Sequence, residues 1–316
     1  MKPHILISGG TGLIGSHLAQ LLIYRGYSVS FLTRQYRSLT GIDVIRWDPE
    51  KQWIDNINIQ DPIAIINLSG ENLTAKAWTA EQKEIIINSR VNSLKLIKSL
   101  VEIRTNQVVR IISTSAIGYY GTYTSGEIFS EESQPGTDFL AKTCVEWERS
   151  VKEIAELGVP TAWVRTGVVL SDKGGAMKAI KDSMQAGMAI PLGGGNQWVP
   201  WIHIRDLVRL FEFLLEESDL SGVFNGVAPA SDTNKSLTRA LAKAYKKTYI
   251  PIGLPAFILK MILGEMASIS LYGSRVSAEK ITNAGFRFQY NNLESAIMSF
   301  RQQKRGDTPF GFSPDS

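Results

Sequence analysis

The beginning of the chain constrains its fold most strongly, because an apolar strand runs into a glycine-rich turn and then into a helix. Residues 4–8 (HILIS) predict a buried strand. An apolar stripe at helical spacing comes next and predicts a helix that ends at Gly26. Between the two, the segment ISGGTGLIG holds three evenly spaced glycines: Gly9, Gly12 and Gly15.

This order of strand, turn and helix is typical of a dinucleotide-binding turn. Gly9 would permit the tight bend, Gly12 would let a pyrophosphate approach the backbone, and Gly15 would let the helix pack on the strand. The free N–H groups and the positive dipole end of the helix would then hold the phosphates. The spacing GxxGxxG is one residue longer than the common form, so the flanking strand and helix carry the prediction together with the glycines.

Strand and helix patterns alternate through the first half of the chain. Short apolar runs rich in β-branched residues predict further strands at residues 27–33, 42–47, 62–68, 108–114 and 160–166. Two longer amphipathic patterns predict helices at residues 79–102 and 140–157. Such alternation predicts an α/β fold, a Rossmann-type doubly wound parallel sheet with right-handed crossovers.

The pattern changes after residue 170, where helices dominate. We predict an NADP(H)-binding Rossmann domain over residues 1–170, rejoined by about residues 200–228. A smaller, mainly helical C-terminal domain on the substrate side is expected over residues 171–199 and 229–303, laid over the strand ends where open α/β sheets bind ligands. Residues 304–316 are expected to be a frayed tail.

Composition limits the cellular setting. Hydrophobic residues make up 44% of the chain and charged residues 20%, as in soluble globular proteins, and no run of 18 apolar residues predicts a membrane span. The single cysteine, Cys144, excludes an internal disulfide and suits a reducing compartment. The net charge of +4 comes from scattered basic residues, which suit anionic ligands without implying nucleic acid. We therefore expect a cytoplasmic protein that binds neither nucleic acid nor a membrane.

The second predicted strand indicates which dinucleotide is bound. Binders of NAD place an acidic residue there for the ribose 2′-hydroxyl, whereas this chain has Thr33, Arg34 and Arg37. A guanidinium pairs with a 2′-phosphate through two parallel hydrogen bonds. The segment favours NADP(H), with a solvated basic strand end as the alternative.

Several segments resemble the extended short-chain dehydrogenase/reductase superfamily, which includes the sugar-nucleotide epimerases. These are NLSGEN (67–72), STSAIGYYG (113–121) and WIHIRDL (201–207). A further set, among them DFLAKTCVEWE, VRTGVVLSDKGGAM and NAGFRF, resembles one atypical epimerase-like branch with a C-terminal domain of unknown function. Some relatives in that branch carry SulA-like or cell-division names. The resemblance implies a Rossmann fold and NADP(H) binding, and it implies no particular substrate.

The resemblance also implies which residues contact NADP(H). The turn and the start of the first helix would contribute Gly9, Thr11, Gly12, Leu13, Ile14 and Gly15. Other contacts would come from Thr33 and Arg34 at the 2′-phosphate, Leu68, Ser69 and Gly70 along the adenosine, Arg90 at the phosphates or ribose, and Val168 and Val169 near the nicotinamide. Core packing is the alternative for Leu68 and the two valines, and a surface salt bridge is the alternative for Arg90.

The catalytic residues of the superfamily are a serine and a Tyr-x-x-x-Lys pair. The tyrosine transfers protons near neutral pH because the lysine and the cationic nicotinamide lower its pKa from about 10. By this resemblance Ser115 is the serine, with Ser113 as the alternative, and Lys142 is the lysine. The tyrosine position falls on Asp138, whose carboxylate does not replace a phenol in the same way.

Two other tyrosines offer a substitute acid at the end of the fifth predicted strand. Of Tyr119 and Tyr120 we select Tyr119, with Ser115 and Lys142, as the candidate catalytic set. The alternative is that these tyrosines line the pocket or support the loop.

The remaining polar and aromatic candidates point to structure or to a substrate pocket. We predict that His203 is a buried, hydrogen-bonding histidine and that Asp206 anchors its helix. No His, Cys and Asp cluster has the spacing of a metal site, so no metal is expected. Trp198 and Trp201 flank a glycine-rich loop, where they would line a substrate pocket or pack in the core.

Two classes of function follow from these patterns. The first is an NADP(H)-binding, epimerase-like oxidoreductase that acts on a small polar substrate. The second is a catalytically weak NADP(H)-sensing or structural protein that acts through a partner, in line with the cell-division names, and Asp138 favours it. The apolar segment 254–267 raises a membrane-peripheral role as a third option, which no basic amphipathic helix in the sequence supports. We expect the segment instead to bury against the second domain or a twin subunit, which leaves a homodimer open.

Overall fold

The computed structural model describes residues 2–35, 41–56, 62–104, 106–124, 126–184 and 187–302. Arg37 and the tail at 304–316 lie outside these residues. The chain forms two compact units. Unit 1 holds the residues up to Tyr119 with Phe139–Arg165 and Val208–Phe224, and unit 2 holds Tyr120–Asp138, Thr166–Leu207 and the residues from Asn225 onward.

Unit 1 is built on a sheet of eight strands in the order β13-β8-β6-β5-β1-β2-β3-β4. The strands are β1 (His4–Ser8), β2 (Val29–Thr33), β3 (Asp43–Asp48), β4 (Trp53–Ile54), β5 (Ile63–Asn67), β6 (Val108–Ala116), β8 (Thr161–Thr166) and β13 (Gly222–Gly226). Strands β1, β2, β3, β5 and β6 pair in parallel, and the short β4 runs antiparallel to β3. The order reverses beside β1, and such a reversal marks where open sheets of this class bind ligands.

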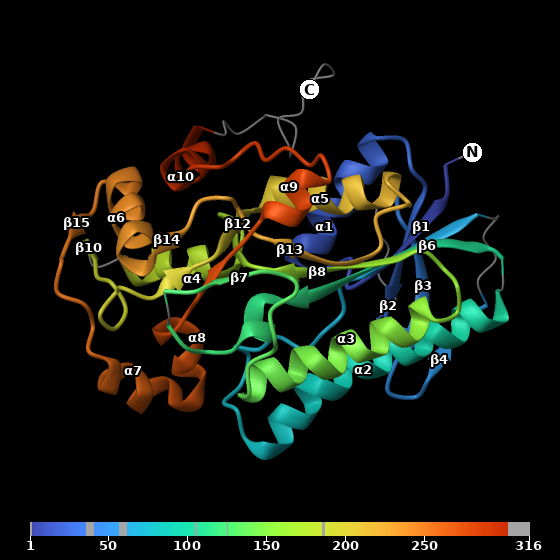
Figure 1. Cartoon of the computed structure of the whole chain (residues 1–316), viewed down its shortest axis with the longest axis horizontal. Helices are drawn as coiled ribbons and strands as arrows, with labels where there is room; N and C mark the ends of the chain where they lie inside the picture. Colours follow the sequence, from blue (N-terminus) through green and yellow to red (C-terminus); the bar gives the residue numbers. More distant parts are fainter. Residues whose placement is uncertain are drawn as a thin grey trace. The chain divides into compact units, whose positions relative to one another are not determined.

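Four helices cover the sheet: α1 (Leu13–Tyr24), α2 (Ala80–Ile103), α3 (Phe139–Ala155) and α5 (Ile204–Glu216). Helices α2 and α3 lie side by side against one face (Figure 1), joined by the Lys98–Glu153 ion pair. An ion pair from Arg25 to Glu212 joins the end of α1 to α5. The core under α2 and α3 is apolar and includes Leu6, Ile65, Leu94, Ile97, Ile111, Trp147 and Val151.

Local chemistry explains where these helices begin and end. Thr79 caps α2, because its hydroxyl accepts a hydrogen bond from the Gln82 N–H. Helix α1 closes at Gly26, whose φ of +79° suits glycine, as the sequence predicted. At the end of α5, the buried Arg110 guanidinium of β6 donates to four backbone carbonyls, those of Leu214, Glu217, Ser218 and Leu220.

Unit 2 is mainly helical, with short strands between the helices. Its elements are β7 (Ile128–Phe129), β9 (Val168–Leu170), α4 (Gly175–Ser183), β10 (Met188–Ala189), β11 (Trp198–Val199), β12 (Trp201–His203), β14 (Asp232–Thr233), α6 (Asn234–Tyr245), β15 (Thr248–Tyr249), α7 (Ala256–Leu263), α8 (Ser268–Leu271), β16 (Arg275–Val276), α9 (Glu279–Asn283) and α10 (Leu293–Gln302). Short 3₁₀ helices span Ile117–Tyr120, where the chain passes from unit 1 to unit 2, and Gly264–Ala267. Its core includes Leu170, Met177, Trp201, Leu241 and Ile297.

Buried hydrogen bonds join the start of α5 to the segment before α10, within unit 2. The buried Asp206 carboxylate accepts from the backbone N–H groups of Gln289 and Tyr290, at 2.9 and 2.8 Å. His203 is also buried, and its ring stacks between Tyr290 and Phe300. His203 Nδ1 accepts from the Arg205 amide, so Nε2 carries the proton and donates to Ser299 Oγ at 3.1 Å. The expected structural roles of His203 and Asp206 agree with these contacts.

The predicted fold class is confirmed. The sheet is mostly parallel with helices on its faces, and the C-terminal region is mostly helical. The predicted strands at 4–8, 27–33, 62–68 and 160–166 correspond to β1, β2, β5 and β8 within two residues. Among the described residues, no helix is both long enough and apolar enough to cross a membrane.

Candidate functional site

The turn after β1 is packed so closely that two of its predicted glycines cannot carry a side chain. Gly9 has a φ of +71°, and a Cβ there would lie 2.6 Å from the Leu68 carbonyl oxygen. A Cβ on Gly15 would lie 2.5 Å from the Gly9 carbonyl oxygen. Contacts this short are incompatible with any other residue, so the backbone of β1, of the loop after β5 and of α1 meet at this turn.

Gly12 differs from the other two. Its backbone is extended (φ −77°, ψ 178°), a conformation open to any residue. Apart from its chain neighbours, a Cβ there would meet one described atom within 4 Å, the Gly9 carbonyl oxygen at 3.2 Å. The side-chain face of Gly12 is therefore open, as the pyrophosphate interpretation of this residue requires.

The turn contains a fourth glycine that the sequence analysis did not single out. A Cβ on Gly10 would lie 2.3 Å from the ring of Phe31, which belongs to β2. The pair Gly9–Gly10 is visible in the sequence. Residue 10 must be glycine because the Phe31 ring of another strand lies against it, and local sequence does not reveal that contact.

The start of α1 suits an anion. Its N-cap residue is Gly12, which has no side chain to accept from the first N–H groups, and no acidic side chain stands in the first turn. Thr11 and Gly12 are exposed, Leu13 and Ile14 are half-buried. The N–H groups of the first turn are thus available to an oxygen ligand.

Thr33 and Arg34 lie at the same edge of the sheet as the glycine turn. Strands β1 and β2 are parallel, with Ser8 opposite Leu32, so the residues after each strand lie at one edge. Arg34 is exposed, and the half-buried Thr33 donates its hydroxyl to the Gln35 carbonyl at 3.2 Å. Arg34 is thus free to extend over the edge that carries the glycine turn.

Arg90 is buried, so a surface salt bridge, the alternative considered for it, is wrong. The guanidinium donates to the carbonyls of Ile86 at 2.8 Å and Glu71 at 3.1 Å, and it lies over the Trp147 ring. A Cβ on Gly70 would lie 3.1 Å from its Cζ atom. Burial lowers the pKa of Arg90. Arg90 thus holds the loop that carries Leu68, Ser69 and Gly70, which are only partly buried or exposed.

A buried hydrogen-bond chain crosses the ends of three adjacent strands. Ser8 of β1 donates to Asn67 Oδ1 of β5 at 2.6 Å, and the Asn67 amide donates to Ser113 Oγ of β6 at 3.2 Å. Ser113 in turn donates to the Thr114 carbonyl. The alternative serine, Ser113, is therefore part of the packing of the sheet.

Ser115 belongs to a second buried array. Its hydroxyl donates to Glu148 Oε1 of α3 at 2.8 Å. Arg165 of β8 binds the same carboxylate through two hydrogen bonds, from Nε to Oε1 and from an Nη to Oε2, both 2.8 Å. The Tyr119 ring stacks on the Arg165 guanidinium, with Cζ 3.4 Å from the ring centroid. The structure thus connects Ser115 and Tyr119, two of the candidate catalytic residues, through Glu148 and Arg165.

The cysteine beside this array has an unreactive thiol. Cys144 is fully buried on α3, and its thiol donates to the Ala116 carbonyl. Burial, with a smaller effect of the Glu148 charge, raises the pKa of Cys144 to about 12. A thiol with that pKa is not a nucleophile at neutral pH.

The two candidate tyrosines have different surroundings. Tyr119, in unit 1, is half-buried. Tyr120, in unit 2, is fully buried, donates to Asn225 Oδ1 at 2.6 Å and stacks on Phe129. A phenol committed to an internal amide holds the structure together, so Tyr119 is the better candidate acid.

Asp138 closes a turn in unit 2. Its Oδ2 accepts from both the backbone N–H and the hydroxyl of Thr122. The turn passes through Gly121, whose φ is +90°, and a Cβ on Gly136 would lie 2.6 Å from the Gly121 Cα. At the position where the resemblance predicts a tyrosine, this chain therefore has a carboxylate engaged in backbone capping, whereas Lys142 on α3 is exposed.

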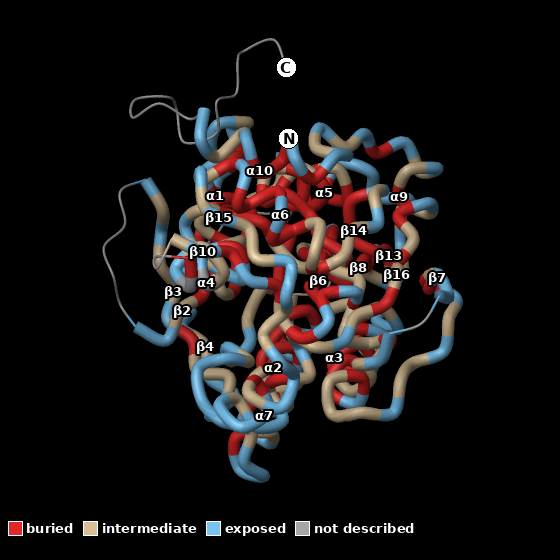
Figure 2. Tube along the Cα trace, turned by 90° about the vertical axis from the view of Figure 1, so that its left-hand side faces the viewer, coloured by how far each residue is buried: buried red, intermediate tan, exposed pale blue. Residues whose placement is uncertain are grey.

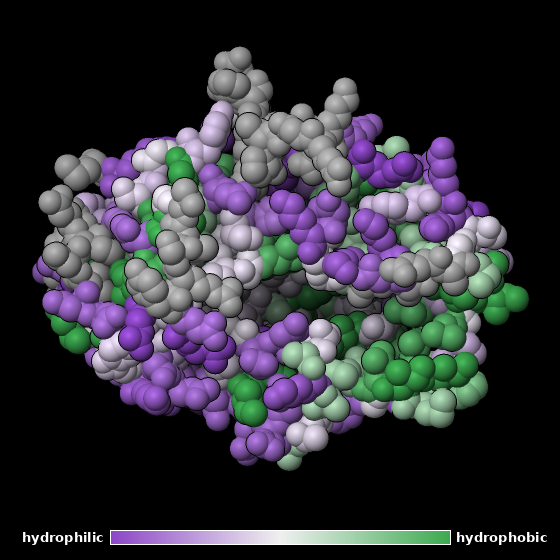
Figure 3. Space-filling view, turned by 180° about the vertical axis from the view of Figure 1, so that it is seen from behind, coloured by the Kyte–Doolittle hydropathy of each residue, from purple (hydrophilic) through white to green (hydrophobic). Residues whose placement is uncertain are grey.

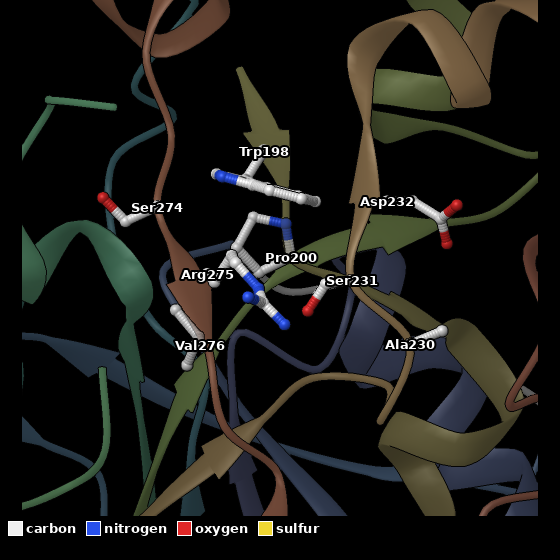
Figure 4. A pocket seen from close by; sticks show the side chains of 8 residues that line it. All are labelled: Trp198, Pro200, Ala230, Ser231, Asp232, Ser274, Arg275 and Val276. Atoms are coloured by element: carbon white, nitrogen blue, oxygen red, sulfur yellow. The ribbon is translucent and has the colours of Figure 1, made fainter. Parts of the chain in front are cut away.

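A small pocket in unit 2 is lined by Trp198, Pro200, Ala230, Ser231, Asp232, Ser274, Arg275 and Val276. The empty space among these residues amounts to about 170 Å³ with the adjoining open solvent included, and it leaves essentially no enclosed room for a water-sized molecule. Arg275 extends into it toward Ser231, beneath the Trp198 ring (Figure 4), and its Nε is buried without a hydrogen-bond partner among the described residues. Asp232 is engaged by Trp201 Nε1 and Ser236 Oγ. Of the two candidate tryptophans, Trp198 lines this pocket and Trp201 is core.

Val168 and Val169 are half-buried in β9, which pairs in parallel with β12 inside unit 2. Val168 also packs against the core of unit 2, as its core alternative stated. Within the described ranges, no group of three or more His, Cys, Asp or Glu side chains is arranged to hold a metal.

Three residues of these sites were missed by the sequence analysis: Glu148, Arg165 and Arg275. A signal existed for the first two. Glu148 sits on the buried face of α3 with Cys144 and Val151, and Arg165 interrupts the apolar strand TAWVRT. Charges at apolar positions of neighbouring elements indicate a buried ion pair, because an unpaired buried charge is costly.

Comparison with known proteins shows which families this chain matches. A sequence model of the NAD dependent epimerase/dehydratase family matches residues 5–225, and one of a domain of unknown function, DUF1731, matches residues 254–300. An epimerase family protein of Mycobacterium bovis is 32% identical over 294 residues, which cover 93% of this chain and 96% of that protein.

Solved structures agree in fold. The human epimerase family protein SDR39U1 (isoform 2), solved with NADPH, is 26% identical with a TM-score of 0.83, covering 95% of this chain and all of that one. A nucleoside-diphosphate sugar epimerase of Corynebacterium glutamicum is 29% identical with a TM-score of 0.75, covering 94% of this chain and 57% of that one.

The Glu148–Arg165 pair is expected to be strongly coupled. Replacing either partner by a residue of similar volume, Glu148→Gln or Arg165→Met, should lower the free energy of unfolding by about 3–5 kcal/mol, because each leaves a buried group unpaired. The double variant should lose much less than the sum of the two. Urea unfolding of the four proteins measures this coupling.

The matched control lies on the same helix, where Arg149 pairs with Glu146 at the surface. The cycle Glu146→Gln with Arg149→Met should give a coupling below about 1 kcal/mol. If the two cycles gave equal coupling energies, the buried array would not be a connected unit.

Proposed function

This chain belongs to the NAD dependent epimerase/dehydratase family, and we propose from that premise that it binds NADP(H) and acts as an epimerase-like oxidoreductase on a small polar substrate. The observation that carries the proposal is the turn after β1, in which Gly9 and Gly15 are fixed by backbone packing while the face of Gly12 stays open. The human relative solved with NADPH supports the choice of cofactor.

The chain's own residues divide the work of holding the cofactor. Gly9, Thr11, Gly12, Leu13, Ile14 and Gly15 would present backbone to the pyrophosphate. Thr33 and Arg34 would bind the 2′-phosphate, and Arg90 would act by holding the loop of Leu68, Ser69 and Gly70 against the adenosine. The contact of Val168 and Val169 with the nicotinamide stays a prediction, as does a cytoplasmic location.

NADP(H), when bound, supplies the hydride donor and acceptor. Ser115 has a specific part in this proposal, because its hydroxyl proton is already directed at Glu148 and any further hydrogen bond would have to be accepted by its oxygen. Arg165 keeps that carboxylate in place. Ser115 would therefore accept a hydrogen bond from a substrate hydroxyl, with Tyr119 as the proton-transfer group and Lys142 holding the ribose.

The pocket around Arg275 supports a polar substrate. The unpartnered Nε of Arg275 is a donor that an oxyanion would satisfy. We therefore propose Arg275 as a binding residue for an anionic group.

A second candidate function is a catalytically weak protein that senses NADP(H) and acts through a partner. The engagement of Asp138 with Thr122 favours it, because the residue in the tyrosine position has no free proton to give. In this case the cofactor site would be retained and no hydride would be transferred.

Gly12→Val should abolish NADPH binding and leave the fold intact. The branched side chain would fill the open face of the turn, while the extended backbone accepts it with a shift of a few tenths of an ångström. NADPH fluorescence titration and circular dichroism measure the two effects. Gly126→Val, at an exposed glycine with open space around it, is the matched control. Retained affinity in a folded Gly12→Val protein would place the nucleotide elsewhere.

Arg34→Ala should weaken NADPH far more than NADH. A charge-assisted hydrogen bond contributes about 1.5–3 kcal/mol, so the NADPH Kd should rise about tenfold or more and the NADH Kd should hardly change. Calorimetric titration of both cofactors into wild type and variant provides the comparison. An equal loss for both cofactors would remove Arg34 from the 2′-phosphate.

Deuterium transfer separates the enzyme from the sensor. Each diastereomer of 4-deuterated NADPH is incubated with the protein and a small-molecule extract of the cells that express it. An enzyme should pass label to a product from one diastereomer only, and Ser115→Ala should slow transfer about a hundredfold or more at unchanged NADPH affinity. Mass spectrometry follows the label. Absence of transfer from both diastereomers would leave the sensing function.

A further inference from the structure

Helix α7 exposes an unusual amount of apolar side chain. Ile252, just before it, is 78% exposed, and on the helix Phe257, Met261 and Ile262 are 69%, 78% and 68% exposed. From the sequence we expected this segment to bury against the second domain or a twin subunit. Figure 3 shows the hydrophobic surface gathered at the lower right, over the region of α7. An exposed apolar patch of this kind marks an interaction surface.

The patch is organised by the way α7 is anchored. Leu259 is buried and Ile258 and Leu263 are half-buried, so these three side chains attach the helix to unit 2. Phe257, Met261 and Ile262 are exposed. Phe257 and Met261 are four residues apart and lie on one stripe, with Ile262 beside it. Lys260 is the single charged residue of the helix.

A neighbouring strand continues the patch. Backbone hydrogen bonds join Leu254 to Pro191 and to Gly193, so the start of α7 lies against the segment that follows β10. Met188 of β10 and Ile190 just after it are also exposed. Figure 2 shows α6, β10, β15 and α7 on one side of unit 2, with most of α7 exposed.

The segment that contains α6 and α7 is strongly basic. The segment 233–264 holds six basic residues, Lys235, Arg239, Lys243, Lys246, Lys247 and Lys260, and no acidic residue, so it is more positive than the whole chain with its net +4. Arg239, Lys246 and Lys260 are exposed. Acidic residues adjoin the segment: Asp232 directly precedes it, Glu265 follows it, Asp172 lies near Tyr245, and Glu294 of α10 pairs with Lys243.

We propose that α7 and its basic surroundings dock on the surface of an anionic lipid bilayer, with Phe257, Met261 and Ile262 inserted at the headgroup level. Apolar side chains projecting from a short helix, accompanied by lysine and arginine, are the combination that binds such a surface. A second copy of the chain is a poorer occupant, because a two-fold contact through α7 would bring the basic residues of the two copies together. The inference is independent of NADP(H) binding.

Vesicle co-sedimentation tests the proposal on the full chain. The protein should bind vesicles of equal parts phosphatidylcholine and phosphatidylglycerol, bind phosphatidylcholine vesicles far more weakly, and lose binding as salt rises. The triple variant Phe257→Ser, Met261→Ser, Ile262→Ser should bind at least about tenfold more weakly. Since each cation contributes about 1 kcal/mol, Arg239→Gln, Lys246→Gln, Lys260→Gln together should weaken binding about a hundredfold at low salt.

Matched controls separate the patch from general surface properties. Ile103→Ser removes an 82% exposed side chain at the end of α2, and Lys51→Gln, Lys95→Gln, Lys152→Gln removes three exposed charges of unit 1. Neither should change vesicle binding, and thermal unfolding should be alike in all variants. Absence of binding to the anionic vesicles, or equal binding by the serine variant, overturns the proposal. A self-associated wild type that the serine variant converts to monomers, without vesicle binding, assigns the patch to a second copy instead.

Discussion

The close approach of three backbone segments at the turn after β1 is the constraint on which the rest of unit 1 depends. Gly9 touches the loop after β5, and Gly15 brings α1 against the turn, while Phe31 of β2 occupies the space above Gly10. These contacts fix the end of β1 relative to its two neighbours in the sheet, at the point where strand order reverses. The same contacts leave Gly12 and the first N–H groups of α1 facing outward, so the packing that builds the sheet also prepares an anion site.

The buried array of Ser115, Glu148, Arg165 and Tyr119 gives this chain a site chemistry different from the Ser, Tyr and Lys set that its sequence resembles. A carboxylate held by two hydrogen bonds from Arg165 accepts a hydrogen bond from the Ser115 hydroxyl, so in the proposed function the serine acts toward the substrate as an acceptor. Asp138, in the tyrosine position, is used for capping a turn. Tyr119 is the phenol beside this array, because its ring stacks on the Arg165 guanidinium.

Sequence periodicity was sufficient to predict the sheet, the helices and the glycine turn, because each depends on residues close together in the chain. Gly9, Gly12 and Gly15 could be identified from spacing, but the different reasons for each became visible only with Leu68 and the Gly9 carbonyl in place. Tyr119 and Tyr120 are adjacent and alike in sequence, and only their partners, Arg165 and Asn225, separate them. Glu148 and Arg275 were missed for the same reason, since their roles come from tertiary neighbours. The expectation that residues 254–267 are buried followed from their apolar character, which does not say which side chains meet solvent.

A crystal structure of the chain with NADP⁺ tests the central claim most directly. The expected result is a pyrophosphate against the backbone of residues 10–14, a 2′-phosphate within hydrogen-bond distance of Thr33 or Arg34, and Ser115 still bonded to Glu148. A dinucleotide bound away from the glycine turn, or an adenosine ribose turned away from Arg34, would contradict the account.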